Sequence, residues 1–331
     1  MSGVGLDEID RGLLQALQID GRVAFSAVAE ILGVSDQTVA RRYRALRAGG
    51  AVHVRGTTWP EAVGQEVWLV RVQCAPEAAG ALSRSLARRP DTSWVLEMSG
   101  GAEILSMLRI GPASTALAQL PRTPRLTGVS AHCVLYTFCG GAVSPLVKHG
   151  PLTTAQCAVL PSPATAPDRD RAVLSDQDQA LLDALAEDGR AGYRALAAVT
   201  GWSQTSVRRR LAELRRTSVV YFDIDFDAAM LGLRSLASLW LMVEPGALSA
   251  AGEALAAHPE VSFAAATTGP ANLYASVQCR DTKALYAYLT GPVAQLPGIR
   301  SVETAPATRT IKQVGRPQEG GPARRMPRQR P

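Results

Sequence analysis

Two short runs of polar and basic residues carry side chains that could bond to the edges of DNA bases. One run spans residues 35–44 (SDQTVARRYR) and the other spans residues 203–212 (SQTSVRRRLA). Arginine can reach guanine or a phosphate, and the first residues of a recognition helix meet base edges in the major groove, so each run is a candidate recognition helix. The side chains predicted to contact DNA are Ser35, Gln37, Thr38, Arg41, Arg42, Arg44, Ser203, Gln204, Thr205, Ser206, Arg208, Arg209 and Arg210.

The arginines of these runs have two interpretations. An arginine run by itself can simply be the solvated face of a packed helix. Within the runs, Arg42 and Arg210 could equally support their own domain or bind an adjacent phosphate. The choice depends on the elements around the runs.

The elements around the first run follow a helix-turn-helix order. Residues 9–17 repeat apolar side chains at three- and four-residue spacing, which predicts a first helix. The Asp-Gly-Arg sequence at residues 20–22 breaks this pattern, with glycine supplying a turn. Gly33 is expected to end a short second helix, and Ser35 to cap the third, because its hydroxyl can accept from free backbone N–H groups. The side chains expected in the core are Ile9, Leu13, Leu14, Leu17, Val28, Ala29, Leu32, Val39, Tyr43 and Leu46.

The whole pattern occurs twice. Residues 6–52 align without a gap to residues 174–220 at an offset of 168, and 19 of the 47 positions are identical. A repeat of this length is an architectural feature rather than a chance motif. It makes DNA binding the favoured interpretation of both arginine runs, on one polypeptide that carries two copies of a unit that usually works as a symmetric pair.

A segment of alternating residues follows each third helix. Residues 52–60 (VHVRGTTWP) predict a small hairpin or wing. The counterpart at residues 219–227 (VVYFDIDFD) alternates in the same way but is acidic, so it would repel phosphate. We therefore expect the second segment to pack against the domain that follows it in its own half.

A second layout, strand–helix–strand–strand–helix–strand, repeats beyond each helical domain. The first half predicts strands at 66–74, 92–100, 102–110 and 128–138, and helices at 76–90 and 113–120. The second half predicts strands at 236–245, 261–269, 271–279 and from Ile299 onward, and helices at 246–259 and 281–289. This βαββαβ order is ferredoxin-like, and the apolar sheet faces of two such units can cover each other. The predicted fold class is α+β, with two winged helix-turn-helix domains alternating with two ferredoxin-like domains.

These motifs resemble the Lrp/AsnC family of bacterial transcription regulators. LDEIDRGLLQALQIDGR and SDQTVARRYRAL are close to the family pattern, and the second copy keeps the same Asp, Asp-Gly-Arg and Ser…Arg-Arg framework. The family joins a helix-turn-helix to a βαββαβ sensor, the RAM domain, and forms dimers and rings through it. Because family chains usually have one such unit, this chain resembles a tandem fusion, a covalent pseudo-dimer that we expect to form homo-oligomers through its RAM domains.

The resemblance also implies an effector, commonly an amino acid, near the turn between the second and third RAM strands. The family often has aspartate at the last position of this turn, where this chain has glutamate in one half and asparagine in the other. The other interpretation is that both are ordinary hairpin turns. The matching positions are Gly100, Gly101, Ala102, Glu103, Gly269, Pro270, Ala271 and Asn272.

The charge of the chain is concentrated at its end. Residues 309–331 hold seven basic residues and one glutamate, a net +6 that equals the net charge of the whole chain. This Pro-, Gly- and Arg-rich stretch predicts disorder, and it could add salt-sensitive phosphate affinity or only solubility. The expected domains are 1–60 and 173–227 (helix-turn-helix), 61–140 and 228–311 (RAM-like), 141–172 (an extended Pro/Ala-rich linker) and 312–331 (a disordered basic tail).

Other residue types point away from metal and membrane chemistry. Five cysteines without a CxxC pair fit a reducing cytosol, and four scattered histidines lack metal-ligand spacing. We expect no metal and no cofactor. No apolar run is long enough to span a bilayer, and the first ten residues show no signal peptide. The sequence therefore predicts a cytoplasmic chain without a membrane partner.

The leading hypothesis is a sequence-specific transcriptional regulator, not an enzyme, whose two non-identical heads bind double-stranded DNA and whose sensors respond to an amino acid or another small molecule. Its half-sites should be about one helical turn apart, or a multiple of that. The alternative comes from proteins resembling this family that are tetrapyrrole (siroheme-type) decarboxylases, for which His132 is the one candidate group. A third hypothesis is a sensor in which one head has lost DNA binding.

Overall fold

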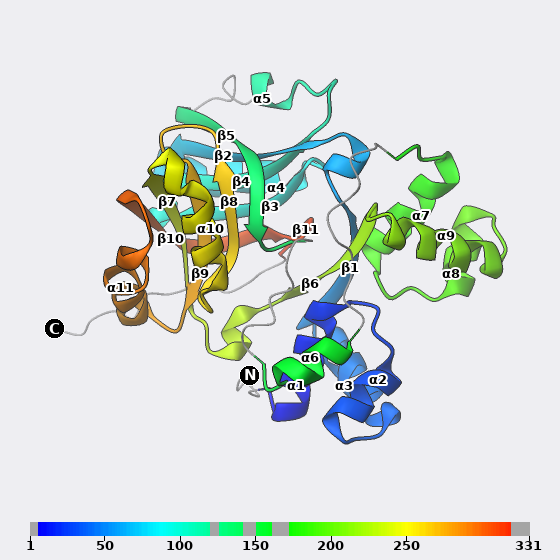
Figure 1. Cartoon of the computed structure of the whole chain (residues 1–331). Helices are drawn as coiled ribbons and strands as arrows, with labels where there is room; N and C mark the ends of the chain where they lie inside the picture. Colours follow the sequence, from blue (N-terminus) through cyan, green and yellow to red (C-terminus); the bar gives the residue numbers. More distant parts are fainter. Residues whose placement is uncertain (1–5, 120–125, 142–149, 161–171, 319–331) are drawn as a thin grey trace. The chain divides into compact units, whose positions relative to one another are not determined.

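The computed structural model describes residues 6–119, 126–141, 150–160 and 172–318, which form two compact units (Figure 1). The head unit contains Met1–Gly64 and Cys139–Leu233, and the sheet unit contains Gln65–Phe138 and Arg234–Pro331. Each unit therefore takes one segment from each half of the repeat. Like domains pair with like domains, so the two halves of the sequence do not form two separate bodies.

The head unit contains two copies of a three-helix head, each followed by one strand. Head 1 is α1 (Glu8–Ile19), α2 (Phe25–Leu32), α3 (Asp36–Ala48) and β1 (Val52–Thr58). Head 2 is α7 (Asp176–Glu187), α8 (Tyr193–Thr200), α9 (Gln204–Arg216) and β6 (Val220–Phe226). Gly33 and Gly201 end the second helices in the left-handed conformation, which confirms the predicted stop after α2.

The predicted apolar faces form the core of the heads. Leu13, Leu17 and Val39 are fully buried, and Val28 is 1% exposed. The same core cluster contains their counterparts from head 2, so both heads contribute to one continuous core. Burial of several aliphatic side chains, each contributing about 1.5–3 kcal/mol, is the main stabilising term here.

The expected wings are strands that pair with each other. β1 and β6 form an antiparallel ribbon in which Val52 lies opposite Phe226 and Thr58 opposite Val220. The predicted hairpin at residues 52–60 is therefore wrong, and so is the expectation that the acidic strand packs against the following domain. The acidic β6 pairs with β1, and this pairing places Asp223 and Asp225 opposite Arg55 and His53. Cross-strand pairs of opposite charge stabilise such a ribbon.

The predicted extended linker contains a helix that packs on head 1. Residues 142–149 and 161–171 lie outside the described part, but between them α6 (Thr154–Val159) begins at a capping box formed by Thr153 and Gln156. Leu152 and Leu160 are buried in the core of the heads. The linker prediction is wrong for this stretch because two leucines in a Pro/Ala-rich sequence suffice to anchor it.

The sheet unit contains two βαββαβ halves. The first half is β2 (Glu66–Cys74), α4 (Pro76–Arg88), β3 (Thr92–Met98), β4 (Glu103–Ile110), α5 (Ala116–Gln119) and β5 (Leu126–Cys139). The second half is β7 (Ser235–Val243), α10 (Leu248–Ala257), β8 (Val261–Thr267), β9 (Leu273–Cys279), α11 (Thr282–Thr290), β10 (Ile299–Gln313) and β11 (Arg316–Pro317). The α+β fold class is confirmed.

The two halves of the sheet unit share strands. The hydrogen-bonded order is β11-β10-β3-β4-β2-β5-β8-β9-β7, and β10 also pairs with β7. Ile299–Pro306 of β10 pair with β7, whereas Ala307–Lys312 pair with β3 of the first half. Because β10 borders both halves, the strand order closes on itself. The inner side chains of the two halves form one cluster that includes Leu69, Met98 and Trp240.

The predicted disordered tail begins too early. Residues 309–313 continue β10, and β11 returns to pair with it. Lys312 is 4% exposed, and its ammonium donates to the Arg89 carbonyl at 2.7 Å and to the Thr92 hydroxyl at 3.0 Å. This charge is therefore part of the folded sheet unit. Residues 319–331 lie outside the described part.

Candidate nucleic-acid interface

Each recognition helix begins at the predicted serine. The Ser35 hydroxyl accepts from the Thr38 amide at 3.2 Å, and the Ser203 hydroxyl accepts from the Ser206 amide at 3.1 Å. In both heads this hydroxyl also lies 3.0 Å from the hydroxyl of the residue three positions later. The four hydroxyl residues thus fix the start of α3 and α9 in the same way.

The remaining predicted contact residues divide into an exposed set and an ion-paired set. The exposed set is Gln37, Arg41, Arg44, Gln204, Thr205, Arg208 and Arg209. Val39 and Val207, fully buried, anchor the opposite face of the two helices. Each head therefore presents an arginine- and amide-bearing helix face to solvent, the side-chain chemistry that contacts bases and phosphates.

Arg42 and Arg210 form the ion-paired set. Arg42 lies 2.7 Å from Asp7 and 3.5 Å from Asp10, and Arg210 lies 2.7 Å from Asp178. These carboxylates belong to the first helix of each head or to its cap. The structure therefore favours domain support over phosphate binding for these two arginines.

The pKa values of Asp10 and Asp178 are shifted in opposite directions. Burial raises the pKa of Asp10, and the neighbouring carboxylate of Asp7 adds to this effect. Burial also opposes ionisation of Asp178, but hydrogen bonds from Arg210 and Ser175 outweigh it and lower its pKa. The difference follows from geometry, because Arg210 donates two hydrogen bonds of 2.7 and 2.9 Å to Asp178.

A symmetric exchange of arginines joins the two heads. Arg22 donates to the carbonyls of Gly189 and Ala191 at 2.7 and 3.1 Å. Arg190 donates to the carbonyls of Gly21 and Val23 at 2.7 and 3.0 Å. Burial lowers the pKa of both guanidiniums. Two charge-assisted bonds in each direction thus hold each Asp-Gly-Arg turn to the other head.

Ion pairs between the heads extend this junction. Arg47 at the end of α3 lies 2.8 Å from Asp188 of head 2, and its counterpart Arg215 lies 2.9 Å from Asp20 of head 1. The sequence prediction missed this junction. Its one signal in the sequence is the identity of the Asp-Gly-Arg triplet in both copies, and the local pattern of that triplet indicates only a turn.

The glycines of that triplet serve close packing rather than backbone conformation. Neither Gly21 nor Gly189 has a positive φ. A Cβ on Gly189 would lie 2.9 Å from backbone atoms of Val54 and Arg55, and one on Gly21 would meet side-chain atoms of Val54 and Phe222 at 2.7 and 2.8 Å. Glycine is therefore required where each turn contacts the ribbon formed by β1 and β6.

The predicted effector turn of the first half is occupied by an ion pair. Gly100 and Gly101 have positive φ, Ala102 is exposed, and Glu103 is buried. Arg71 donates to both Glu103 oxygens at 3.1 and 2.8 Å and also contacts Glu303. This acidic side chain is thus already neutralised.

The matching turn of the second half is used by backbone contacts. The side chain of Asn272 accepts from the Val243 amide at 2.9 Å and donates to its carbonyl at 2.8 Å. Gly269 has a positive φ, and a Cβ there would lie 2.6 Å from His132. Pro270 is exposed and Ala271 half-buried. Both polar groups of Asn272 therefore fix the end of β7.

His132, the candidate group for tetrapyrrole chemistry, is fixed among neighbours. Its Nδ1 lies 2.9 Å from the Thr268 carbonyl, and its Nε2 lies 3.3 Å from the Ser130 hydroxyl. The ring also packs on Trp240, with centroids 4.9 Å apart. These contacts account for a structural histidine between the two halves of the sheet unit.

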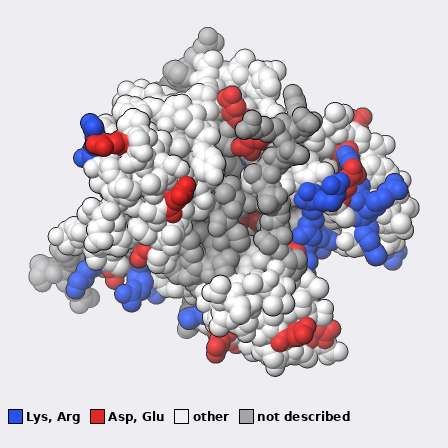
Figure 2. All heavy atoms as spheres, viewed as in Figure 1, with Lys and Arg blue, Asp and Glu red and all other residues white. Residues whose placement is uncertain are grey.

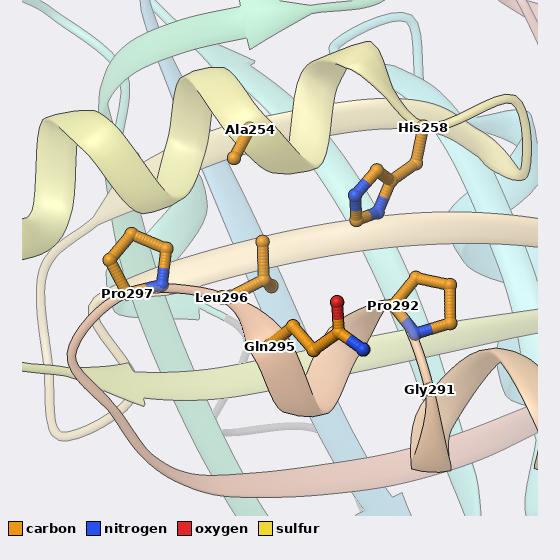
Figure 3. Close-up of a pocket in the computed structure, with 7 residues that line it drawn as sticks. All are labelled: Ala254, His258, Gly291, Pro292, Gln295, Leu296 and Pro297. Atoms are coloured by element: carbon orange, nitrogen blue, oxygen red, sulfur yellow. The ribbon is translucent and has the colours of Figure 1, made fainter.

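One open cavity lies on the helical side of the second RAM half (Figure 3). Its volume is about 350 Å³, and it lies between α10 and the turn after α11. Among its lining side chains the imidazole of His258 and the amide of Gln295 are the polar groups. No charged side chain lines it, and none of the predicted effector positions belongs to it.

Within the described ranges, no cluster of three or more His, Cys, Asp or Glu side chains is arranged to hold a metal ion. In the same part of the chain, no helix combines the length and the apolar character needed to cross a membrane.

Comparisons with known proteins match both helix-turn-helix copies and the second βαββαβ half. The AsnC-type helix-turn-helix domain matches residues 6–47 and 174–215, and the Lrp/AsnC ligand binding domain matches residues 236–317. The HTH-type transcriptional regulator FL11 of Pyrococcus horikoshii is 26% identical over 145 residues, covering 44% of this chain and 95% of that protein. The Bkd operon transcriptional regulator of Pseudomonas aeruginosa is 30% identical over 138 residues, covering 40% of this chain and 90% of that protein.

A likeness of fold extends over the whole chain. The crystal structure of the siroheme decarboxylase NirDL matches with a TM-score of 0.65 over 93% of both chains, at 14% sequence identity. At this identity the TM-score shows a common fold alone. It carries no residue of one protein over to the other.

Proposed function

Because the chain belongs to the Lrp/AsnC family of transcriptional regulators, we propose that it binds DNA sequence-specifically through two non-identical heads. The supporting observation is that α3 and α9 expose arginine and amide side chains on heads that are joined as a symmetric pair. Such a pair in one chain matches a covalent pseudo-dimer. We expect the two heads to bind two half-sites on one duplex. The half-sites would be about one helical turn apart, or a multiple of that.

A DNase footprint of the purified protein upstream of its own gene tests this proposal. We expect protection of two half-sites, lost when Arg41 and Arg209 are both changed to Ala. Both are exposed and have no ion pair in the described structure. Arg11→Ala, an exposed change on α1, is the matched control and should leave the footprint intact. Absence of protection at low salt would contradict the proposal.

We also propose a small-molecule response at the first-half turn. Glu103 supplies a carboxylate that could bind the ammonium group of an amino acid in place of Arg71. The second-half turn offers no such group, because Asn272 is engaged by the β7 backbone. Thermal shifts with single amino acids, compared between the wild type and Glu103→Gln, test this. A shift that persists in the variant would place the ligand elsewhere.

For the assembled state, we propose that the two sheet faces cover each other within one chain. We further propose that several such chains associate into larger homo-oligomers. The inner sheet faces of both halves are covered within the chain by one shared cluster. Light scattering gives the mass in solution. A mass that is always that of a single chain would argue against further assembly.

A tetrapyrrole decarboxylase is the second candidate, favoured by the whole-chain likeness of fold to NirDL. A crystal structure of NirDL holds an iron-uroporphyrin III analogue. Titration of this chain with iron uroporphyrin, read by the absorbance band, tests the candidate. A saturable band shift would favour this candidate over the regulator, and an unchanged spectrum would argue against it.

A further inference from the structure

We propose that the two heads divide the recognition of DNA between them. Head 2 supplies most of the affinity for phosphates, and head 1 supplies discrimination among bases through Asp36. The inference rests on the proposed DNA-binding function and assigns different roles to its two parts. The operator would then consist of one strongly bound half-site and one selectively read half-site.

The two heads carry different charge on their second and third helices. α2 and α3 hold four arginines together with Glu30 and Asp36, whereas α8 and α9 hold six arginines and Glu213. On the face shown in Figure 2, arginines gather over the lobe of α7–α9, and acidic side chains dominate the lobe of α1–α3. The electrostatic attraction to phosphate is therefore unequal between the heads.

Ion pairs make this difference larger. On α2 and α3 of head 1, Arg42 and Arg47 are paired with carboxylates, so the arginines without an ion pair to any described residue are Arg41 and Arg44. Glu30 and Asp36 are exposed and also have no ion pair in the described residues. The charges of these two arginines and two acidic groups cancel, so the helix pair of head 1 offers phosphate no net positive charge.

The corresponding set in head 2 is entirely basic. Arg210 and Arg215 are paired with Asp178 and Asp20, and Glu213 is also paired with Arg210. The exposed arginines that remain without an ion pair in this part of the structure are Arg194, Arg208, Arg209 and Arg216. Four uncompensated guanidiniums on two adjacent helices form a phosphate-binding surface.

Arg208 is held in position for this contact. Its guanidinium lies over the ring of Tyr193, 5.0 Å from the centroid, at the start of α8. The equivalent position in head 1 is Ala40. Because the helix before the recognition helix crosses the DNA backbone, an arginine that joins both helices is placed to reach a phosphate.

Asp36 gives head 1 discrimination among bases, whereas Arg208 gives head 2 affinity for phosphate. It is the first residue of α3, it is exposed, and its carboxylate accepts from the Gln37 amide at 2.8 Å. The first turn of a recognition helix meets base edges, where a carboxylate can accept from the amino group of cytosine. Sites without such a donor leave the carboxylate unpaired near phosphates, so Asp36 lowers affinity for them. The counterpart in head 2 is the neutral Gln204.

Reciprocal residue swaps between matched positions of the two heads test this division of phosphate affinity and base discrimination. The variants are Asp36→Gln with Gln204→Asp, and Ala40→Arg with Arg208→Ala, each placing in one head the residue of the other. All are made in the full chain, and circular dichroism melting checks that they fold. Dissociation constants for the footprinted duplex and for a random duplex are measured across a KCl series, with Arg11→Ala as control.

We expect the charge swaps to move the salt dependence. Arg208→Ala should reduce the slope of log K against log salt by about 0.9 on both duplexes, and Ala40→Arg should increase it by about 0.9. Asp36→Gln should tighten binding to the random duplex and reduce the cognate-to-random ratio by about fivefold or more. Gln204→Asp should weaken binding to both duplexes.

The outcomes separate this inference from the function on which it rests. If the wild type shows no salt-dependent binding to any duplex, the proposed function fails and the inference fails with it. If the wild type binds but Asp36→Gln leaves the ratio unchanged, or Arg208→Ala alters the slope no more than Arg11→Ala, the division between heads is wrong while DNA binding stands.

Discussion

The exchange of Arg22 and Arg190 between the heads should add substantially to the stability that the apolar core gives the head unit. We consider Arg22→Ala and Arg190→Ala, singly and together. Each wild-type guanidinium donates two hydrogen bonds to backbone carbonyls of the other head. Each also lies over aromatic rings, Arg190 at 4.2 Å from the Phe25 centroid and Arg22 at 5.5 Å from that of Tyr193.

The expected loss follows from these contacts. A hydrogen bond from a charged donor contributes about 1.5–3 kcal/mol net, and a partly buried cation–π contact contributes about 0.5–2 kcal/mol. The contributions overlap, and water can satisfy part of what is lost, so we expect about 3 kcal/mol for each single change. The double variant should lose less than twice that amount, because the two arginines stabilise the same junction.

Hydrogen exchange read by mass spectrometry measures this loss in the head unit separately from the sheet unit. A loss of about 3 kcal/mol corresponds to roughly a hundredfold lower protection. The affected amides should be those of β1 and β6, which form the ribbon at the junction. Arg22→Lys should lie between the wild type and the alanine variant, because lysine keeps the charge but lacks the planar fork that reaches two carbonyls.

Arg11→Ala is the control for this experiment. Its side chain is exposed on α1, so its removal should change stability by no more than about 0.5 kcal/mol. The reasoning is refuted if the alanine variants at Arg22 and Arg190 change the protection of β1 and β6 no more than this control does. Equal loss of protection in the sheet unit would also count against it.

Four further predictions concern the contacts of single residues. Gly189→Ala should destabilise the heads by about 1–3 kcal/mol in urea unfolding, and more than Gly21→Ala, because the new methyl group meets backbone at the first site and side chains at the second. The folded pKa of Asp178 is lowered, so its stabilisation is present above its unfolded pKa and disappears as the pH falls through the folded value; Asp178→Asn should cost stability at pH 7 and flatten that acid loss in melting curves. The folded pKa of Asp10 is raised, so its ionisation opposes folding at pH 7, and Asp10→Asn should cost less than Asp178→Asn. Arg71→Met should destabilise the sheet unit by about 3–5 kcal/mol in calorimetry, because it leaves a buried carboxylate without its partner; an unchanged transition would show that this ion pair is not stabilising.

The local elements were accessible to sequence analysis because each depends on near neighbours. The three- and four-residue spacing of leucines predicts α1. The serine caps predict where α3 and α9 begin, and Gly33 predicts where α2 ends. The strand predicted at residues 66–74 matches β2 at both ends. The polar face of each recognition helix was identified for the same reason, since the buried valine fixes which side is exposed.

Errors arose where one segment meets another that is distant in sequence. The leucines that anchor α6, the burial of Lys312 and the pairing of β1 with β6 all depend on partners more than a hundred residues away. Periodicity within a segment reports that a face is apolar or charged, but it does not identify what covers that face.

The sequence by itself determined that this chain carries two helix-turn-helix heads and two βαββαβ units, because repeats, caps and periodicity are encoded locally. The tertiary structure alone decided that heads pair with heads and that β10 serves both sheets. It also decided which arginines remain available for DNA. Arg41 and Arg42 are adjacent in sequence and equal in charge, yet Arg41 is exposed while Arg42 is held by Asp7. Only folding brings a carboxylate within reach of one guanidinium and leaves the other in solvent.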